Sequence, residues 1–263
     1  TSAFALHDLT RFGVVVDRFS SLDLETLRAQ LERPAKICMF ESPINPTLRV
    51  ADIAGIVAMA QAAGALTVFD GTFCPPPIQS ALAMGIDLVV HSASKFFGGH
   101  ADVLAGVVAG SHALLGPIES WRRRTGGLLA PDPAWLCQRS WPTLKLRLQA
   151  QQEAAMQVAL GLQKDVVSGR IASVTYPGLP GHPDQETVAR QMNGGGCVLA
   201  VEFLGGLEQV LSAADRLQVI ARAASLGGVE SLATVPAYTT HAPLSSAQRQ
   251  AAGISDSLLR VAV

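Results

Sequence analysis

The sequence predicts an α/β fold in which a mostly parallel sheet is followed by a smaller α+β domain. In the first half of the chain, short apolar runs alternate with helix-sized segments. These runs are apolar on both sides, which predicts parallel strands covered on both faces of the sheet. The second half combines one long helical pattern with further strands. We therefore expect a larger domain over residues 1–146 and a smaller one over 147–263.

The elements of the first half follow from apolar spacing and from helix-ending residues. Leu24, Leu27 and Leu31 repeat at helical spacing, and Gly64 stands where the C-terminal cap of an Ala-rich helix belongs. The expected order is a helix over 23–31, a strand over 37–40, a helix from 54 to Gly64, a strand over 65–69, a short helix over 78–84, and strands over 86–90 and 104–109.

The second half begins with a helical pattern over 143–167 that we expect to link the two domains. A strand over 197–203 and a helix over 207–221 follow. These elements predict the smaller α+β domain.

Composition limits the partners of the protein. Only 16% of the 263 residues are charged while 49% are hydrophobic, so we expect apolar surface to be buried in a homo-oligomer. The 20 basic and 21 acidic residues form no basic stripe, which argues against nucleic acid as a partner. The most apolar run, 54–69, is short and interrupted by Gln61 and Gly64, so no membrane partner is expected.

The cysteines predict a reducing compartment. All four are far apart in the sequence, with no CxxC pair and no nearby Cys/His pairing: Cys38, Cys74, Cys137 and Cys197. This spacing suits free thiols better than a disulfide framework or a zinc site. We therefore expect a cytoplasmic protein without a metal centre.

Chemistry-bearing residues follow three of the predicted strands, where ligands of open α/β sheets bind. They are Asn45 in the proline-rich stretch 41–46, Asp70, and Lys95 with Ser92 and Ser94. Taken singly, each is better explained by a structural role: a turn for Asn45, a helix N-cap for Asp70 and a solvated side chain for Lys95. Together they supply an amine for a Schiff base, a carboxylate for a pyridine nitrogen and hydroxyls for a phosphate, as a pyridoxal 5'-phosphate (PLP) site requires. The prolines also make the Ser42–Pro43 and Asn45–Pro46 bonds candidates for cis geometry.

Six motifs occur in a fixed order along the chain. They are ESPINPTLRVADI from Glu41, VFDGTF from Val68, DLVVHSASKFFGGHADVLAGVV from Asp87, YPGLPGHP from Tyr176, ASLGGVESL from Ala224, and THAPL followed by AAGISDSLLRVAV at the C-terminus. With them the sequence resembles the PLP-dependent enzymes of cysteine and methionine metabolism. That family includes cystathionine γ-synthase, cystathionine γ-lyase, cystathionine β-lyase, methionine γ-lyase and the homoserine-ester sulfhydrylases.

The resemblance implies an aspartate-aminotransferase-like fold (PLP fold type I) and carbon–sulfur lyase or transferase activity in a dimer of dimers. Lys95 takes the Schiff-base position and the catalytic role, and Asp70 takes the position that faces the pyridine nitrogen. Ser92 and Ser94 take the phosphate positions. The remaining matches are Asn45, which serves the cofactor or the substrate carboxylate, and the substrate-carboxylate contacts Ser225 and Arg260. The substrate would be a sulfur amino acid such as cystathionine, methionine or an O-acylhomoserine.

Departures from the family pattern leave an alternative open. Gly71, Pro142 and Ala224 replace residues usual in the family, and the family's upstream stacking tyrosine and phosphate-binding turn have no counterpart in the sequence. We therefore expect a chain truncated at both ends, whose own activity is open. A non-catalytic homologue or interface scaffold is the first alternative. A nucleotide-binding Rossmann domain is the second, although no glycine-rich first turn supports it.

Overall fold

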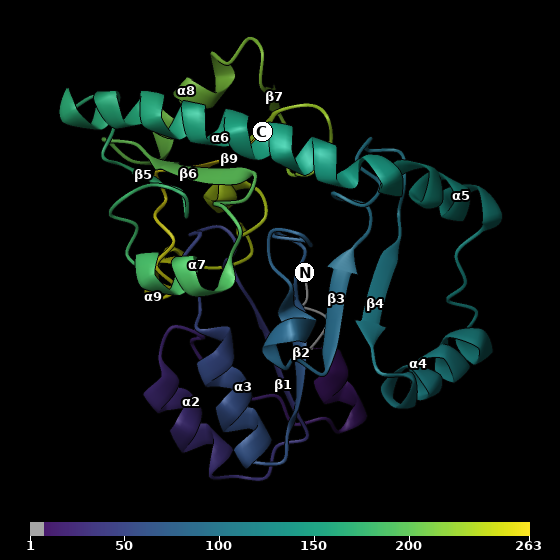
Figure 1. Cartoon of the computed structure of the whole chain (residues 1–263). Coiled ribbons are helices and arrows are strands. Elements are labelled where there is room, and N and C mark those ends of the chain that lie inside the picture. The colour runs from purple at the N-terminus through teal and green to yellow at the C-terminus, as the bar shows by residue number, and fades with distance from the viewer. Residues whose placement is uncertain (1–7) are drawn as a thin grey trace.

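The computed structural model describes residues 8–263 and contains two sheets. The first has the strand order β1-β2-β3-β4 and the second the order β5-β6-β9-β8-β7. Figure 1 shows the long helix α6 lying over the second sheet, with the first sheet and its helices on the other side of the molecule.

The first sheet confirms the predicted parallel strands. β1 (Ile37–Glu41), β2 (Leu66–Asp70) and β3 (Leu88–Ser92) run parallel, whereas β4 (Gly106–Gly110) is antiparallel to β3. The helix α2 (Leu24–Leu31) begins after Asp23, whose carboxylate accepts a hydrogen bond from the Thr26 N–H. The helix α3 (Ile53–Ala62) is followed by Gly64 at φ 71°, as its position in the sequence predicts.

One face of this sheet is more deeply buried than the other. Side chains of alternate strand residues, among them Phe40, Phe69 and Val89, pack in one apolar cluster with Ile53 and Ile56 of α3. The residues between them are half-buried or exposed, and Ile37 is 61% exposed. Within the described residues, the sequence-based expectation of full cover therefore holds for one face only, because the helices α2 and α3 pack on a single side.

The short helix η2 (Ala81–Met84) connects β2 to β3 within the first sheet. The helices α4 (His112–Thr125) and α5 (Pro131–Ser140) follow β4 and lead towards the second sheet. A 3-10 turn, η3 (Trp141–Thr143), then leads into α6 (Leu144–Val167), which confirms the predicted long helix. Figure 1 shows α4 and α5 beyond β4, at the edge of the molecule.

The second sheet is mostly antiparallel, as an α+β unit requires. Its central strands are β6 (Val198–Glu202) and β9 (Leu258–Ala262), which pair along their whole length. The other elements are β5 (Ser173–Thr175), α7 (Gln185–Gln191), α8 (Leu207–Asp215), β7 (Ala221–Arg222), β8 (Leu232–Thr234), η4 (Pro236–Tyr238) and α9 (Ser246–Ala251); the first described turn is η1 (Thr10–Phe12). The helix predicted over 207–221 is wrong beyond Asp215, since the chain turns there and enters β7.

An apolar cluster joins the two sheets. It contains Phe73 and Phe96 from the first part, Leu148 from α6, and Cys197 and Leu226 from the second part. Polar contacts cross the same boundary, including the paired hydrogen bonds from Arg49 to Asp184, both 2.8 Å long. The domain boundary at residue 146 stays a prediction, and α6 passes through it.

Candidate functional site

Two of the predicted site residues end neighbouring parallel strands. Asp70 ends β2, Ser92 ends β3, and Asp70 pairs in register with Val90. Thr72 connects them: its N–H donates to Asp70 Oδ1 at 3.1 Å, and its hydroxyl accepts from the Ser92 N–H at 2.9 Å. Asp70 and Ser92 therefore lie at the same edge of the sheet, and the convergence of Lys95 with Asp70 stays a prediction.

Lys95 lies in the tight turn that follows β3. The turn is closed by the Lys95 N–H on the Ser92 carbonyl and by the Gly98 N–H on the Ala93 carbonyl. The Lys95 side chain is half-buried, and its Nζ donates to Ser225 Oγ at 2.9 Å. Burial, and then the nearby Arg260 guanidinium, lower the pKa of the Lys95 ammonium, so the neutral amine forms more readily there than in water.

Arg260 lies in the middle of β9 and is 3% exposed. Its Nη1 donates to Asn45 Oδ1 and its Nη2 to the Ser225 carbonyl, each at 3.0 Å. The Nε hydrogen has no partner among the described residues, and the guanidinium lies 5.8 Å from the centre of the Phe73 ring. Burial lowers the pKa of Arg260 to about 10.

The stretch that presents Asn45 is a turn with two cis bonds, Ser42–Pro43 and Asn45–Pro46, which confirms the prediction for both. Its backbone is closed by the Ile44 N–H on the Arg49 carbonyl at 2.9 Å. The Asn45 N–H donates to Oε1 of Glu41 at 3.1 Å. Glu41 is absent from the residues predicted for the site, although a carboxylate at the end of an apolar strand was a signal.

The two serines differ in their hydrogen bonds. Ser94 Oγ accepts from the Ala105 N–H at 3.0 Å and lies 3.4 Å from the Ala105 carbonyl. Ser92 is half-buried, and within residues 8–263 its hydroxyl has no hydrogen-bond partner. Ser92 therefore has a hydroxyl available to an anion, whereas Ser94 also serves to fix the entry into β4.

Gly71 and His91 are fitted to each other directly beside Asp70. A Cβ at Gly71 would lie 2.6 Å from Cε1 of the His91 ring, so any other residue at position 71 would displace that ring. His91 is buried and packs edge-on against Phe97, whose ring stacks on Trp141. Burial lowers the pKa of His91, although the Asp70 carboxylate opposes that effect.

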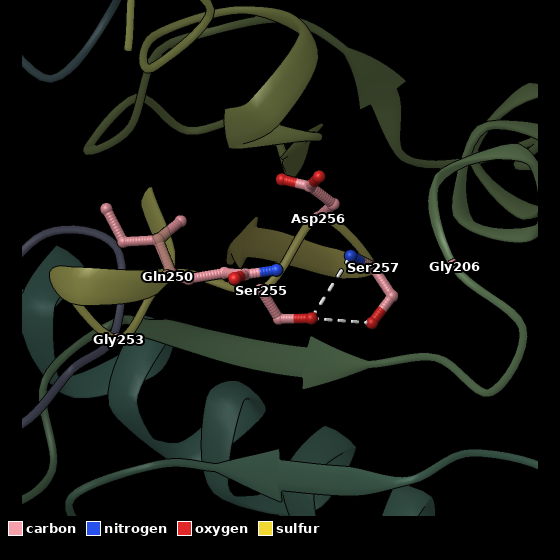
Figure 2. A pocket seen from close by; sticks show the side chains of 7 residues that line it. Gly206, Gln250, Gly253, Ser255, Asp256 and Ser257 are labelled. Carbon is pink, nitrogen blue, oxygen red and sulfur yellow. Dashed lines mark hydrogen bonds between the residues drawn. The ribbon is translucent and has the colours of Figure 1, made fainter. Parts of the chain in front are cut away.

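Two hollows of the molecule lie outside this arrangement. One, of about 390 Å³, is lined by residues at the entry to β9 and by Gly206, and Figure 2 shows the Ser255 and Ser257 hydroxyls bonded to each other within it. Its Asp256 carboxylate is already held by Arg249 and Ser246. The other, of about 610 Å³, lies on the side of Thr47 and Glu202. Neither is lined by Lys95 or Asp70.

Comparison with known proteins gives this arrangement a family. The profile of the "Cys/Met metabolism PLP-dependent enzyme" family matches residues 1–263. The chain belongs to this family. It is 40% identical over 256 residues to cystathionine β-lyase of Lactococcus lactis subsp. cremoris and 38% identical over 265 residues to L-methionine γ-lyase of Pseudomonas putida. These matches cover 97% and 100% of the chain.

Solved structures of the family confirm the predicted PLP fold type I. Cystathionine γ-synthase of Xanthomonas oryzae pv. oryzae, solved with cystathionine, superposes on the whole chain with a TM-score of 0.93 and 37% identity, and the chain covers 67% of it. The chain spans 66% of the length of the two curated relatives named above, slightly less than two thirds.

The residues present fit the family's cofactor. Asp70 and Ser92 end β2 and β3 at the same edge of the sheet, and the half-buried Lys95 lies in the turn that follows β3. The buried Nε of Arg260 lacks a partner among the described residues, as expected of a guanidinium that binds a carboxylate ligand.

None of the helices within residues 8–263 is long and apolar enough to cross a membrane.

Proposed function

We propose that the protein makes or breaks a carbon–sulfur bond at the β or γ carbon of a sulfur amino acid, with PLP attached to Lys95. One observation carries the proposal most directly. The Lys95 amine contacts Ser225, and the same residue accepts a hydrogen bond from Arg260 through its backbone carbonyl. An amine for covalent chemistry and a guanidinium for a carboxylate therefore lie on either side of one residue, as an amino-acid substrate requires.

Five residues would hold the cofactor. Lys95 would provide the amine, Asp70 would serve the ring nitrogen, Ser92 and Ser94 would serve the phosphate, and Asn45 would serve the ring oxygen. When bound, PLP supplies an electron sink for the charge left when the Cα proton of the substrate is removed. A carboxylate at the Asp70 position favours the protonated ring nitrogen, and so strengthens that sink.

Lys95 is the group that moves the proton. An amine accepts a proton only in its neutral form, and burial together with the Arg260 charge favours that form. Ser225 Oγ accepts a hydrogen bond from Nζ and so fixes the direction in which the amine points. Once the substrate amine has replaced it on the cofactor, the freed Lys95 amine would take the proton from Cα and later return one to the product or the departing group.

Arg260 binds the substrate carboxylate, with Ser225 and Asn45 as its supports. A guanidinium matches a carboxylate with two parallel hydrogen bonds. Asn45 and the Ser225 carbonyl already hold the two terminal nitrogens, and the guanidinium is fixed in orientation before substrate arrives. This preorganisation reduces the entropy lost on binding.

We propose that the protein acts as a homo-oligomer, a dimer of dimers, in the cytoplasm. The three tryptophans lie on α4, α5 and η3 with 65%, 60% and 54% of their surface exposed: Trp121, Trp135 and Trp141. Exposed aromatic side chains are enriched at subunit interfaces. All four cysteines are free thiols, which suits a reducing compartment.

Product analysis tests the function. The purified protein is incubated with PLP and, separately, with L-cystathionine, L-methionine and an O-acylhomoserine plus a thiol, and released pyruvate, 2-oxobutanoate and new thioethers are measured. We expect turnover of at least one substrate, lost in Lys95→Ala and kept in Lys145→Ala, whose lysine is exposed on α6. Absence of product with every substrate would favour the non-catalytic alternative. Equal turnover by Lys95→Ala would remove Lys95 from the reaction.

A further inference from the structure

Glu41 is a half-buried carboxyl that the proposed chemistry leaves without a role. It is the last residue of β1 and pairs in register with Asp70, the last residue of β2. Its Oε1 accepts the Asn45 N–H at 3.1 Å. Glu41 therefore fixes the backbone of the residue whose side chain holds Arg260.

These contacts form a continuous chain from β1 to Lys95. Asn45 Oδ1 accepts from Arg260 Nη1 at 3.0 Å, Arg260 Nη2 donates to the Ser225 carbonyl at 3.0 Å, and Ser225 Oγ accepts from Lys95 Nζ at 2.9 Å. The Asn45 turn has no regular helix or strand of its own, so the Glu41 carboxyl is a specific restraint on it. A displacement of the Asn45 backbone would move the amide that orients the guanidinium.

The charge of Glu41 changes near neutral pH. Burial raises its pKa to about 7, the Asp70 carboxylate adds to the effect, and the Asn45 N–H opposes it. Among the described residues, the charged groups on this side are Asp70 on β2 and, beyond Asn45, Arg260 on β9. An ionised carboxylate accepts a stronger hydrogen bond than a neutral carboxyl does. The Asn45 turn is thus held more firmly above neutral pH than below it.

We propose that Glu41 is a positioning residue that sets, through Asn45, how tightly Arg260 binds the substrate carboxylate, and that it makes this binding depend on pH. The inference rests on the proposed function, because it takes Arg260 as the carboxylate contact. It adds Glu41 to the residues that support substrate binding. It also adds a pH dependence of that binding, which the chemistry at Lys95 does not itself require.

The test measures binding of 4-(methylthio)butanoate, which has the carboxylate and thioether of methionine but no amine to react. Calorimetry of the PLP-loaded protein from about pH 6 to about pH 8.5 gives the dissociation constant. The wild-type protein should bind about fivefold more weakly at the acid end, the ratio of a charged to a neutral hydrogen bond. Glu41→Gln keeps an oxygen acceptor at the same position but has no carboxyl to titrate. The affinity of this variant for the analogue should therefore lack the fivefold change seen with the wild-type protein.

Two further variants complete the design. Glu41→Leu removes the acceptor and should weaken binding roughly 3- to 10-fold at all pH values. Glu202→Gln, the same change at the last residue of β6, should keep the wild-type pH response. The inference is overturned if Glu41→Gln retains that response, or if the wild-type protein does not bind the analogue. Borohydride trapping of PLP on Lys95, measured on the same samples, separates this failure from failure of the proposed function.

Discussion

Replacing Glu41 by glutamine should change the stability of the fold in a pH-dependent way. In the folded protein, burial and then Asp70 raise the pKa of this carboxyl to about 7 from an ordinary value of 4.5. Because the folded state disfavours the ionised form, wild-type stability falls as pH rises from the lower value to the higher one. The difference between the two pKa values corresponds to roughly 3 kcal/mol of unfolding free energy.

Urea unfolding, followed by tryptophan fluorescence, measures this effect. Glu41→Gln has no carboxyl to ionise, so its unfolding free energy relative to wild type should increase by roughly 3 kcal/mol between about pH 4 and about pH 8. Glu202→Gln controls for loss of a glutamate at another strand end, and it should retain the wild-type fall. A constant difference between Glu41→Gln and wild type across this range would refute the argument that burial perturbs Glu41.

Two further changes test the packing around the site. Gly71→Ala should cost about 1–3 kcal/mol of unfolding free energy, because its Cβ would lie 2.6 Å from the His91 ring, and His91→Ala in the same protein should relieve that cost; an equal cost in both backgrounds would contradict the proposed clash. Arg49→Met removes two 2.8 Å hydrogen bonds to Asp184 and should cost about 1–2 kcal/mol, whereas Arg33→Met, at an exposed ion pair, should cost less than about 0.5 kcal/mol; urea titrations giving equal losses would show that the bridge between the two parts adds nothing.

Strong local signals explain why β1, β2 and β3 were predicted from the sequence to within about two residues. Each is a short apolar run ended by a polar residue: Glu41, Asp70 or Ser92. The helices α4 and α5 were not predicted. Leu114, Ile118 and Trp121 of α4 do stand at helical spacing, but none of the residues of α4 is buried, so this pattern faces no core of the chain. The antiparallel direction of β4 depends on pairing with β3, which spacing along the chain does not specify.

The site was predicted in its residue types but not in its connections. Asn45 and Arg260 are 215 residues apart and Lys95 and Ser225 are 130 apart, so only the fold brings them into contact. Ser94 was expected at a phosphate, and its hydrogen bond to Ala105 shows a structural role that its position beside Lys95 did not indicate. Glu41 was overlooked because the sequence does not reveal its hydrogen bond, whose donor is the backbone N–H of Asn45 in a proline-rich turn.

Trapping the cofactor tests the central claim most directly. The purified protein is loaded with PLP, reduced with borohydride, digested and mapped by mass spectrometry, with Lys95→Ala and Lys145→Ala treated in parallel. The account predicts a single phosphopyridoxyl adduct on the peptide that contains Lys95, present in the wild-type protein and in Lys145→Ala and absent from Lys95→Ala. An adduct on another lysine, or none on the wild-type protein, would contradict it.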